Sequence, residues 1–156
     1  MKDSMLQIID EAIQLELNMS RLYGIFSEHI VEDRAFWFRL EIEEKNHAAL
    51  LKTGKDFAAF KRFPSGLIPD NLKVLQESNW KVLEAIDKFV KNPDRELAFK
   101  LASDLENSAG EIHFQRFMET NTTDDLGDIF QKLNQADKDH AERIYRYWQD
   151  VIHSSK

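Results

Sequence analysis

The sequence predicts an all-α fold with five helical segments. Glycine and proline, which interrupt regular structure, number only five and three among 156 residues. Apolar residues recur at steps of three and four along most of the chain, which is the period of one face of an α-helix. The length suits one domain with a core of its own. We therefore expect residues 1–156 to form a single domain.

The first two segments form a predicted helix pair. A heptad-spaced apolar row predicts a helix from Ser4 to Ile30. Asp33 is a suitable N-cap for a second helix, which extends to about Lys61. The stretch Phe63–Pro69, with two prolines and a glycine, is the clearest break in the chain.

Three more helices are predicted after this break. An amphipathic pattern within residues 70–91 predicts the third. Asn92 and Pro93 have the residue types of an N-cap and a first-turn proline, and predict a helix that ends near Glu119. A polar run from Asn121 supplies a cap and first-turn acids for the last helix, at about 124–152.

Two of the apolar rows are interrupted in the same way, by a carboxylate and a histidine three residues apart. The second helix carries Glu44 and His47, and the last carries Asp137 and His140. Residues at this spacing lie on one side of a helix. A carboxylate in a core is costly unless it is paired or bound to a metal. Either motif alone is equally well explained by an ion pair, but together they predict one shared metal site.

The two halves of the chain resemble each other around these motifs. Residues 40–48 align with 133–141, and Glu16 aligns with Glu106 on the helix that precedes each motif. A duplicated helix pair predicts a four-helix bundle with a pseudo-two-fold axis, and such a bundle needs one long crossover. The segment at about 63–92 has the right length. We therefore expect the third helix to be the crossover and to carry no ligand.

Six residues form the candidate metal site, four carboxylates and two imidazoles: Glu16, Glu44, His47, Glu106, Asp137 and His140. Oxygen and imidazole ligands without sulfur suit iron or manganese, with zinc as a possible substitute. Four carboxylate charges balance two divalent ions, which favours a dinuclear site over a mononuclear one.

This arrangement resembles the rubrerythrin branch of the ferritin-like di-iron carboxylate proteins, in which two helices each supply a glutamate and two each supply Glu-x-x-His. The resemblance implies a ferritin-like four-helix bundle whose long crossover contains an additional helix. It implies that Glu16 and Glu106 each bind one metal ion terminally and that each histidine holds one ion. Glu44 and Asp137 would bridge the two ions.

Two further residues have a role only if this resemblance holds. Tyr23, seven residues after Glu16, would hydrogen-bond to a ligand without touching the metal, although ordinary core packing explains it equally well. His113 has the same place after Glu106, and a satisfied core histidine is a slightly better explanation for it.

The chain departs from the rubrerythrin pattern at three points. Asp137 replaces the usual glutamate and is one methylene shorter, and Ala109 stands where many rubrerythrins carry an additional glutamate. Rubrerythrins typically also have a cysteine-ligated rubredoxin module, and this chain has no cysteine. Electrons would therefore come from a separate donor protein.

The resemblance implies a di-iron oxidoreductase that reduces peroxide or dioxygen. The alternatives are a ferritin-like protein that binds and stores iron, and a non-catalytic bundle with a vestigial metal site. The net charge of −7 and the absence of a basic cluster argue against a nucleic-acid partner. The apolar runs are too short to cross a membrane, and the N-terminus does not resemble a secretory signal. We expect a cytoplasmic homodimer.

Overall fold

The computed structural model describes residues 2–56, 69–108 and 125–154, and all three ranges are helical. The all-α class is therefore confirmed, with no strand in the ranges described. The elements in chain order are α1 (Lys2–His29), a short 3-10 turn η1 (Val31–Asp33), α2 (Arg34–Asp56), α3 (Pro69–Lys91), α4 (Arg95–Glu106) and α6 (Asp125–Ser154).

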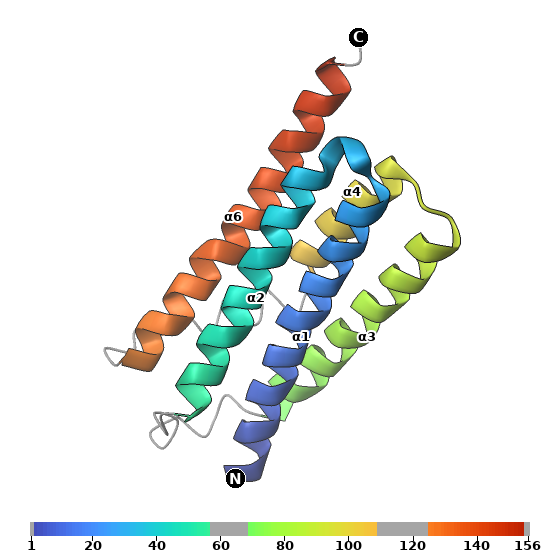
Figure 1. Ribbon diagram of the computed structural model, residues 1–156. Helices are drawn as coiled ribbons and strands as arrows, with labels where there is room; N and C mark the ends of the chain where they lie inside the picture. The colour runs from blue at the N-terminus through green and yellow to red at the C-terminus, as the bar shows by residue number, and fades with distance from the viewer. Residues whose placement is uncertain (1, 57–68, 109–124, 155–156) are drawn as a thin grey trace.

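The helices are arranged as a closed ring. Helix α1 packs between α2 and α3, while α4 contacts both α3 and α6, and α6 closes the ring against α2. Figure 1 shows α6, α2, α1 and α3 side by side, with α4 behind them. The predicted crossover helix, α3, is thus a member of the ring.

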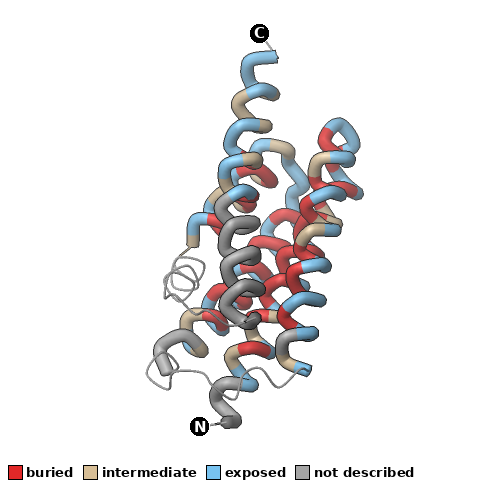
Figure 2. The backbone as a smooth tube through the Cα atoms, turned by 90° about the vertical axis from the view of Figure 1, so that its left-hand side faces the viewer, coloured by how far each residue is buried: buried red, intermediate tan, exposed pale blue. Residues whose placement is uncertain are grey.

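One core is shared by all the helices of the ring. Its largest fully buried side chains include Trp37, Tyr23, Phe26 and Phe89. Figure 2 shows the buried residues on the sides of the helices that face one another. Helix α3 contributes five members to this core, at Leu75, Val82, Ala85, Ile86 and Phe89. Burial of these side chains explains why α3 packs onto the other helices of the ring.

Small residues on α1 allow α2 to approach closely. A Cβ atom at Gly24 would lie 3.2 Å from the side-chain carboxyl carbon of Glu41. One turn earlier, the hydroxyl of Ser20 donates a hydrogen bond of 3.0 Å to the backbone oxygen of Glu41. This close approach brings the two inward faces that carry Glu16 and Glu44 against each other.

The start of α2 differs from the prediction. Asp33 does not cap this helix; it lies buried in η1. Its two carboxylate oxygens each accept a hydrogen bond of 2.7 Å from the guanidinium of Arg95, and the hydroxyl of Tyr147 donates a third at 3.0 Å. A bidentate partner satisfies a buried carboxylate more fully than the single backbone donor of a cap. Asp33 therefore links the starts of α2 and α4 to α6.

The ends of α4 differ from the prediction as well. Its N-cap is Asp94, whose carboxylate accepts a hydrogen bond of 2.8 Å from the backbone of Leu97, and not Asn92. The helix ends at Glu106, well before the predicted end near Glu119. The side chain of Asn107 donates a hydrogen bond of 2.8 Å to the backbone oxygen of Ser103. Such local bonds compete with helix continuation.

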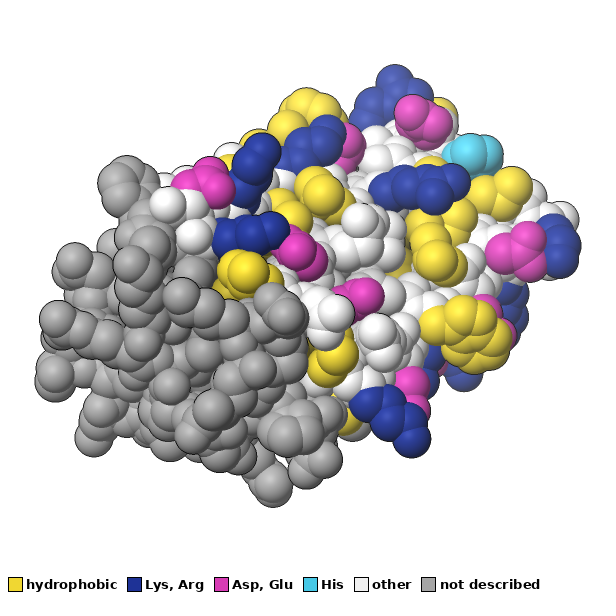
Figure 3. Space-filling view, turned by 90° about the horizontal axis from the view of Figure 1, so that it is seen from below, with side chains coloured by type: hydrophobic (Ala, Val, Ile, Leu, Met, Phe, Trp, Pro, Cys, Tyr) yellow, Lys and Arg dark blue, Asp and Glu magenta, His cyan; other side chains and the backbone are white. Residues whose placement is uncertain are grey.

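The surface of the described residues is mixed in character. Figure 3, seen from below, shows hydrophobic side chains interspersed with charged ones. Within the described ranges, no helix combines the length and apolar character that crossing a membrane requires.

Candidate metal centre

Five of the six predicted ligands lie together in the interior of the helix ring. Helix α1 supplies Glu16, α2 supplies Glu44 and His47, α4 supplies Glu106, and α6 supplies His140. All five side chains belong to buried residues. Helix α3 supplies none of the residues in these groups, as far as the described residues extend.

The five residues form two groups of three that share Glu44. One group is Glu16, Glu44 and His47, the other is Glu44, Glu106 and His140, and the ligand atoms within each group lie within 4.8 Å of one another. The two oxygens of Glu44 face different histidines. Its Oε2 lies 2.9 Å from Nδ1 of His47, and its Oε1 lies 2.9 Å from Nδ1 of His140. This is the orientation of a carboxylate that bridges two ions.

The other two carboxylates complete one group each. Oε2 of Glu16 lies 3.2 Å from Nδ1 of His47, and Oε1 of Glu106 lies 3.6 Å from Nδ1 of His140. Two ligand atoms that bind one ion at about 2.1 Å and at right angles lie about 3.0 Å apart. The observed histidine–carboxylate separations are close to this value, and each group is compact enough to hold a metal ion.

Two buried polar atoms of the centre have no hydrogen-bond partner among the described residues. They are Oε2 of Glu106 and Nδ1 of His140. The latter lies 2.9 Å from Glu44, but without the alignment of a hydrogen bond. Buried polar groups are nearly always satisfied, so each exception needs an explanation. A metal ion between His140, Glu44 and Glu106 would satisfy Nδ1 of His140, and it would satisfy Oε2 of Glu106 if that carboxylate bound the ion through this oxygen.

The carboxylates also determine the charge of the two histidines. Burial by itself would lower the pKa of His47, but hydrogen bonds to Glu16 and Glu44 outweigh it and raise the pKa to about 10. For His140, the close carboxylates of Glu106 and Glu44 likewise outweigh burial and raise the pKa to about 12. Both imidazoles are therefore protonated at neutral pH when no metal is bound, and an ion would have to displace these protons.

The pKa of Glu44 moves in the opposite direction. Burial would raise the pKa of this carboxyl group, but the contacts with His140 and His47 hold it well below its usual range. Glu44 is therefore ionised and has the protonation state that a bridging ligand requires.

Glu43 belongs to the centre although the sequence did not single it out. Its Oε2 accepts a hydrogen bond of 2.8 Å from Nε2 of His140, and Arg143 binds both of its oxygens, at 2.6 and 3.1 Å. Burial would raise the pKa of Glu43, but Arg143 and His140 together lower it. Metal-binding histidines commonly donate their other ring N–H to such a carboxylate. Glu43 stands in a run of charged residues on α2, so helical periodicity offered no signal for it.

Tyr23 contacts the centre from α1. Its hydroxyl donates a hydrogen bond to Oε1 of Glu106, in the other half of the chain.

Two predicted residues of the site cannot be placed in the same way. Asp137 lies in α6 one turn before His140, but its side chain is outside the described residues, and His113 lies outside them altogether. Ala109 also falls outside the described ranges.

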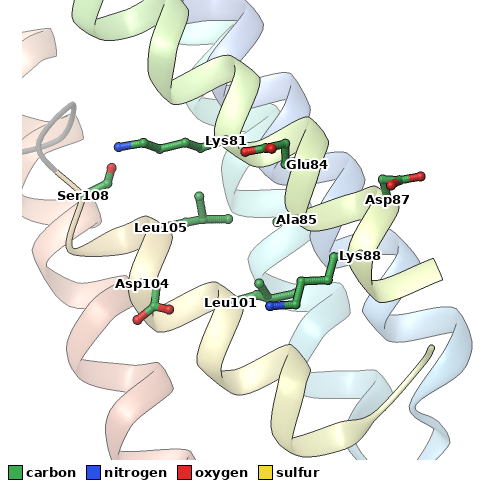
Figure 4. Close-up of a pocket in the computed structure, with 9 residues that line it drawn as sticks. All are labelled: Lys81, Glu84, Ala85, Asp87, Lys88, Leu101, Asp104, Leu105 and Ser108. Atoms are coloured by element: carbon green, nitrogen blue, oxygen red, sulfur yellow. The ribbon is translucent and has the colours of Figure 1, made fainter. Parts of the chain in front are cut away.

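A groove of about 560 Å³ runs over the outside of the ring between α3 and α4. Figure 4 shows charged side chains from both helices around its apolar lining residues Ala85, Leu101 and Leu105. Among the described residues, none of the candidate ligands lines it. This groove is therefore distinct from the buried centre.

Comparisons of the chain with protein-family models, with curated proteins and with solved structures gave no match. The function therefore has to be inferred from the side chains of the centre itself.

Proposed function

We propose that the protein binds two metal ions in the buried centre and uses them as a rubrerythrin-type oxidoreductase. The observation that supports this most directly is the position of Glu44, whose two oxygens each face a different histidine at 2.9 Å. One ion would lie between Glu16, Glu44 and His47. The other would lie between Glu44, Glu106 and His140.

Iron is the metal that we propose. The described ligand atoms are carboxylate oxygens and imidazole nitrogens, which suit iron and manganese. Three carboxylates leave two divalent ions with excess positive charge. Asp137, one turn before His140 in α6, would supply the fourth carboxylate and neutralise it. In this proposal α1, α2, α4 and α6 form a ferritin-like bundle, and α3 is its crossover.

Two bound iron ions would supply the electrons that reduce peroxide or dioxygen, with replacement electrons from a donor protein. The residues of the chain would set the conditions for this reaction. Glu44 holds the two metal positions at a fixed separation, and Glu43 orients His140 through Nε2. Tyr23 donates a hydrogen bond to Glu106 and so keeps a proton beside a ligand.

A second candidate function is a non-catalytic bundle in which the same residues form an ion-pair network. It is favoured by the pKa values of the histidines, raised to about 10 and about 12. Two protonated histidines nearly balance three carboxylates without any metal. The two functions differ in metal content, which can be measured directly.

The test is anaerobic titration of the metal-free protein with ferrous iron, followed by hydrogen peroxide. We expect the protein to bind two ions per chain. Peroxide should then form ferric iron rapidly, and the absorbance of the ferric iron measures this step. Glu44→Gln should lose both ions because it removes the shared ligand charge. Glu41→Gln, the same change on the same helix at a residue paired with Lys45, should retain them. Less than one ion per chain in the wild type, or full loading of Glu44→Gln, would contradict the proposal.

A further inference from the structure

A series of aromatic rings leads away from the candidate metal centre. It begins at Tyr23, whose hydroxyl is hydrogen-bonded to Glu106. The ring of Tyr23 stacks on that of Trp37, with a centroid separation of 5.7 Å and an interplanar angle of 19°. Both side chains are fully buried. The first two members of the series therefore lie in the core and join the centre to α2.

From Trp37 the series continues to α6 by two short branches. Trp37 contacts Phe99 at a centroid distance of 4.7 Å, and Phe99 stacks on Trp148 at 4.6 Å. Trp37 also contacts Phe36 at 4.9 Å, and Phe36 stacks on Tyr147 at 4.1 Å. Tyr147 and Trp148 are only partly buried. Each branch thus ends at a tyrosine or tryptophan that reaches the surface.

The residue types in this series have a specific chemical property. Tyrosine, tryptophan and cysteine have the side chains that lose one electron most easily. This chain has no cysteine. It has three tryptophans and three tyrosines, and two of each lie in the series. The remaining two, Trp80 and Tyr145, are 61% and 62% exposed and lie outside it.

We propose that these aromatic residues conduct single electrons from the surface at Tyr147 and Trp148 to the metal centre. This inference rests on the proposed function. Reduction of dioxygen to water takes four electrons, of which two bound ferrous ions would supply two, so the other two would come through the protein. Tyr23 gives one electron to that centre and its phenolic proton to Glu106, across their hydrogen bond. Trp37 then gives an electron to the tyrosyl radical, which takes its proton back from Glu106.

The remaining steps return Trp37 to its reduced state. Its Nε1 has no hydrogen-bond partner in the described part of the chain, so Trp37 keeps its proton while it is oxidised. Trp148 supplies the next electron across Phe99, or Tyr147 supplies it across Phe36 and passes its proton to Asp33, 3.0 Å away. A one-electron donor at the surface then reduces the terminal residue. The net change is one electron from the donor to the centre, with no proton consumed.

The experiment exposes protein that has been loaded anaerobically with ferrous iron to dioxygen in the absence of a donor, so that two of the four electrons have to come from the protein. Ferric absorbance reports oxidation of the iron, electron paramagnetic resonance reports protein radicals, and peptide mass spectrometry locates oxidised tryptophan and tyrosine. We expect oxidation at Trp148 and Tyr147 and none at Trp80 and Tyr145. Oxidants that diffuse through solvent would attack the more exposed pair instead. Equal or greater oxidation of Trp80 and Tyr145 would overturn the inference.

Variants test the route. Trp37→Phe keeps an aromatic ring that is hard to oxidise, and should abolish oxidation of Trp148. Trp80→Phe is the matched control and should leave the Trp148 signal unchanged. Tyr23→Phe removes only a hydroxyl group and should also abolish the Trp148 signal. It therefore tests the route even if the Trp37 variant fails to fold. Iron that is not oxidised in the wild type contradicts the proposed function. Iron that is oxidised while the Trp148 signal persists in a folded Trp37→Phe or Tyr23→Phe variant contradicts the electron route alone.

Discussion

Glu43 accepts a hydrogen bond of 2.8 Å from Nε2 of His140. The other ring nitrogen, Nδ1, lies 2.9 Å from Glu44, the next residue of α2. Two adjacent glutamates therefore contact opposite sides of one imidazole. Glu43 is itself held by both terminal nitrogens of Arg143. The orientation of His140 toward the centre is thus determined by a network that lies outside the candidate ligands.

This network makes Glu43 important for metal binding although it binds no metal. Loss of such a partner typically lowers metal affinity by about 10- to 100-fold. We expect Glu43→Gln to weaken iron binding by about this factor, because the amide lacks the charge that holds His140 and Arg143. Competition with a chelator measures the affinity. Glu41→Gln, two residues away, is the control and should bind like the wild type. Equal affinity in the Glu43 variant would show that this hydrogen bond does not position the histidine.

The two groups of ligands should be separable by substitution. Glu16→Gln should remove the ion beside His47 and leave the other, whereas Glu106→Gln should do the reverse, because each glutamate belongs to only one group. Elemental analysis of each folded variant gives the remaining ions per chain. Loss of both ions in both variants would mean that the two positions fill only together.

Asp137 can be tested in the same way, although its side chain is outside the described residues. We expect Asp137→Asn to lose one ion, because it removes the fourth carboxylate charge. Asp150→Asn is the matched control in the same helix, at an exposed residue. Unchanged metal content in Asp137→Asn would remove this residue from the proposed ligand set.

Metal binding should release protons. The pKa of His47 is raised to about 10 and that of His140 to about 12, so both are charged at pH 7 in the metal-free protein. A metal ion binds only the neutral imidazole, and apparent affinity should therefore rise with pH in this range. Calorimetric titration in buffers of different ionisation enthalpy counts the released protons. The count should fall in His47→Gln and stay constant in His29→Gln, whose histidine is exposed. Binding without proton release would mean that the histidines are neutral before the metal arrives.

The same groups predict how the stability of the metal-free protein depends on pH. A folded-state pKa of about 10 for His47, above its ordinary value of 6.5, stabilises the folded state. This contribution is complete below pH 6.5 and is lost as pH rises through 10. Thermal unfolding should therefore show a falling midpoint over this range, and bound metal should reduce the fall. A midpoint that rises between pH 7 and 10 would be incompatible with protonated histidines.

Asp33 should be important for stability and not for metal binding. Asp33→Asn breaks a pair in which the carboxylate is buried and Arg95 is 37% exposed. A fully buried pair costs about 3–5 kcal/mol to break, and the exposure of Arg95 reduces our expectation to about 2 kcal/mol. Urea unfolding measures this loss. The control is Asp87→Asn, which breaks the exposed pair with Lys91 and should cost less than about 0.5 kcal/mol. Equal losses would show that Asp33 has no special role.

Sequence reasoning worked best where the information is local. The positions of Glu44 and His47 in an apolar row predicted that both face inward, and both are buried. The helical period is determined by neighbouring residues, so it needs no knowledge of the rest of the chain. Helix ends were predicted less well, as Asp33 and the end of α4 show. The best partner of Asp33 is Arg95, far along the sequence, and no local rule identifies it.

The sequence by itself predicted that the chain is helical and that six polar residues face its interior, five of which lie together in the described part of the structure. Only the tertiary structure decided how these residues meet: that Glu44 is shared between two histidines, that Glu43 lies behind His140, and that α3 completes the ring. The physical reason is that periodicity determines which face of a helix is apolar, whereas packing determines which faces come together and in what register. Contacts between distant residues depend on that register.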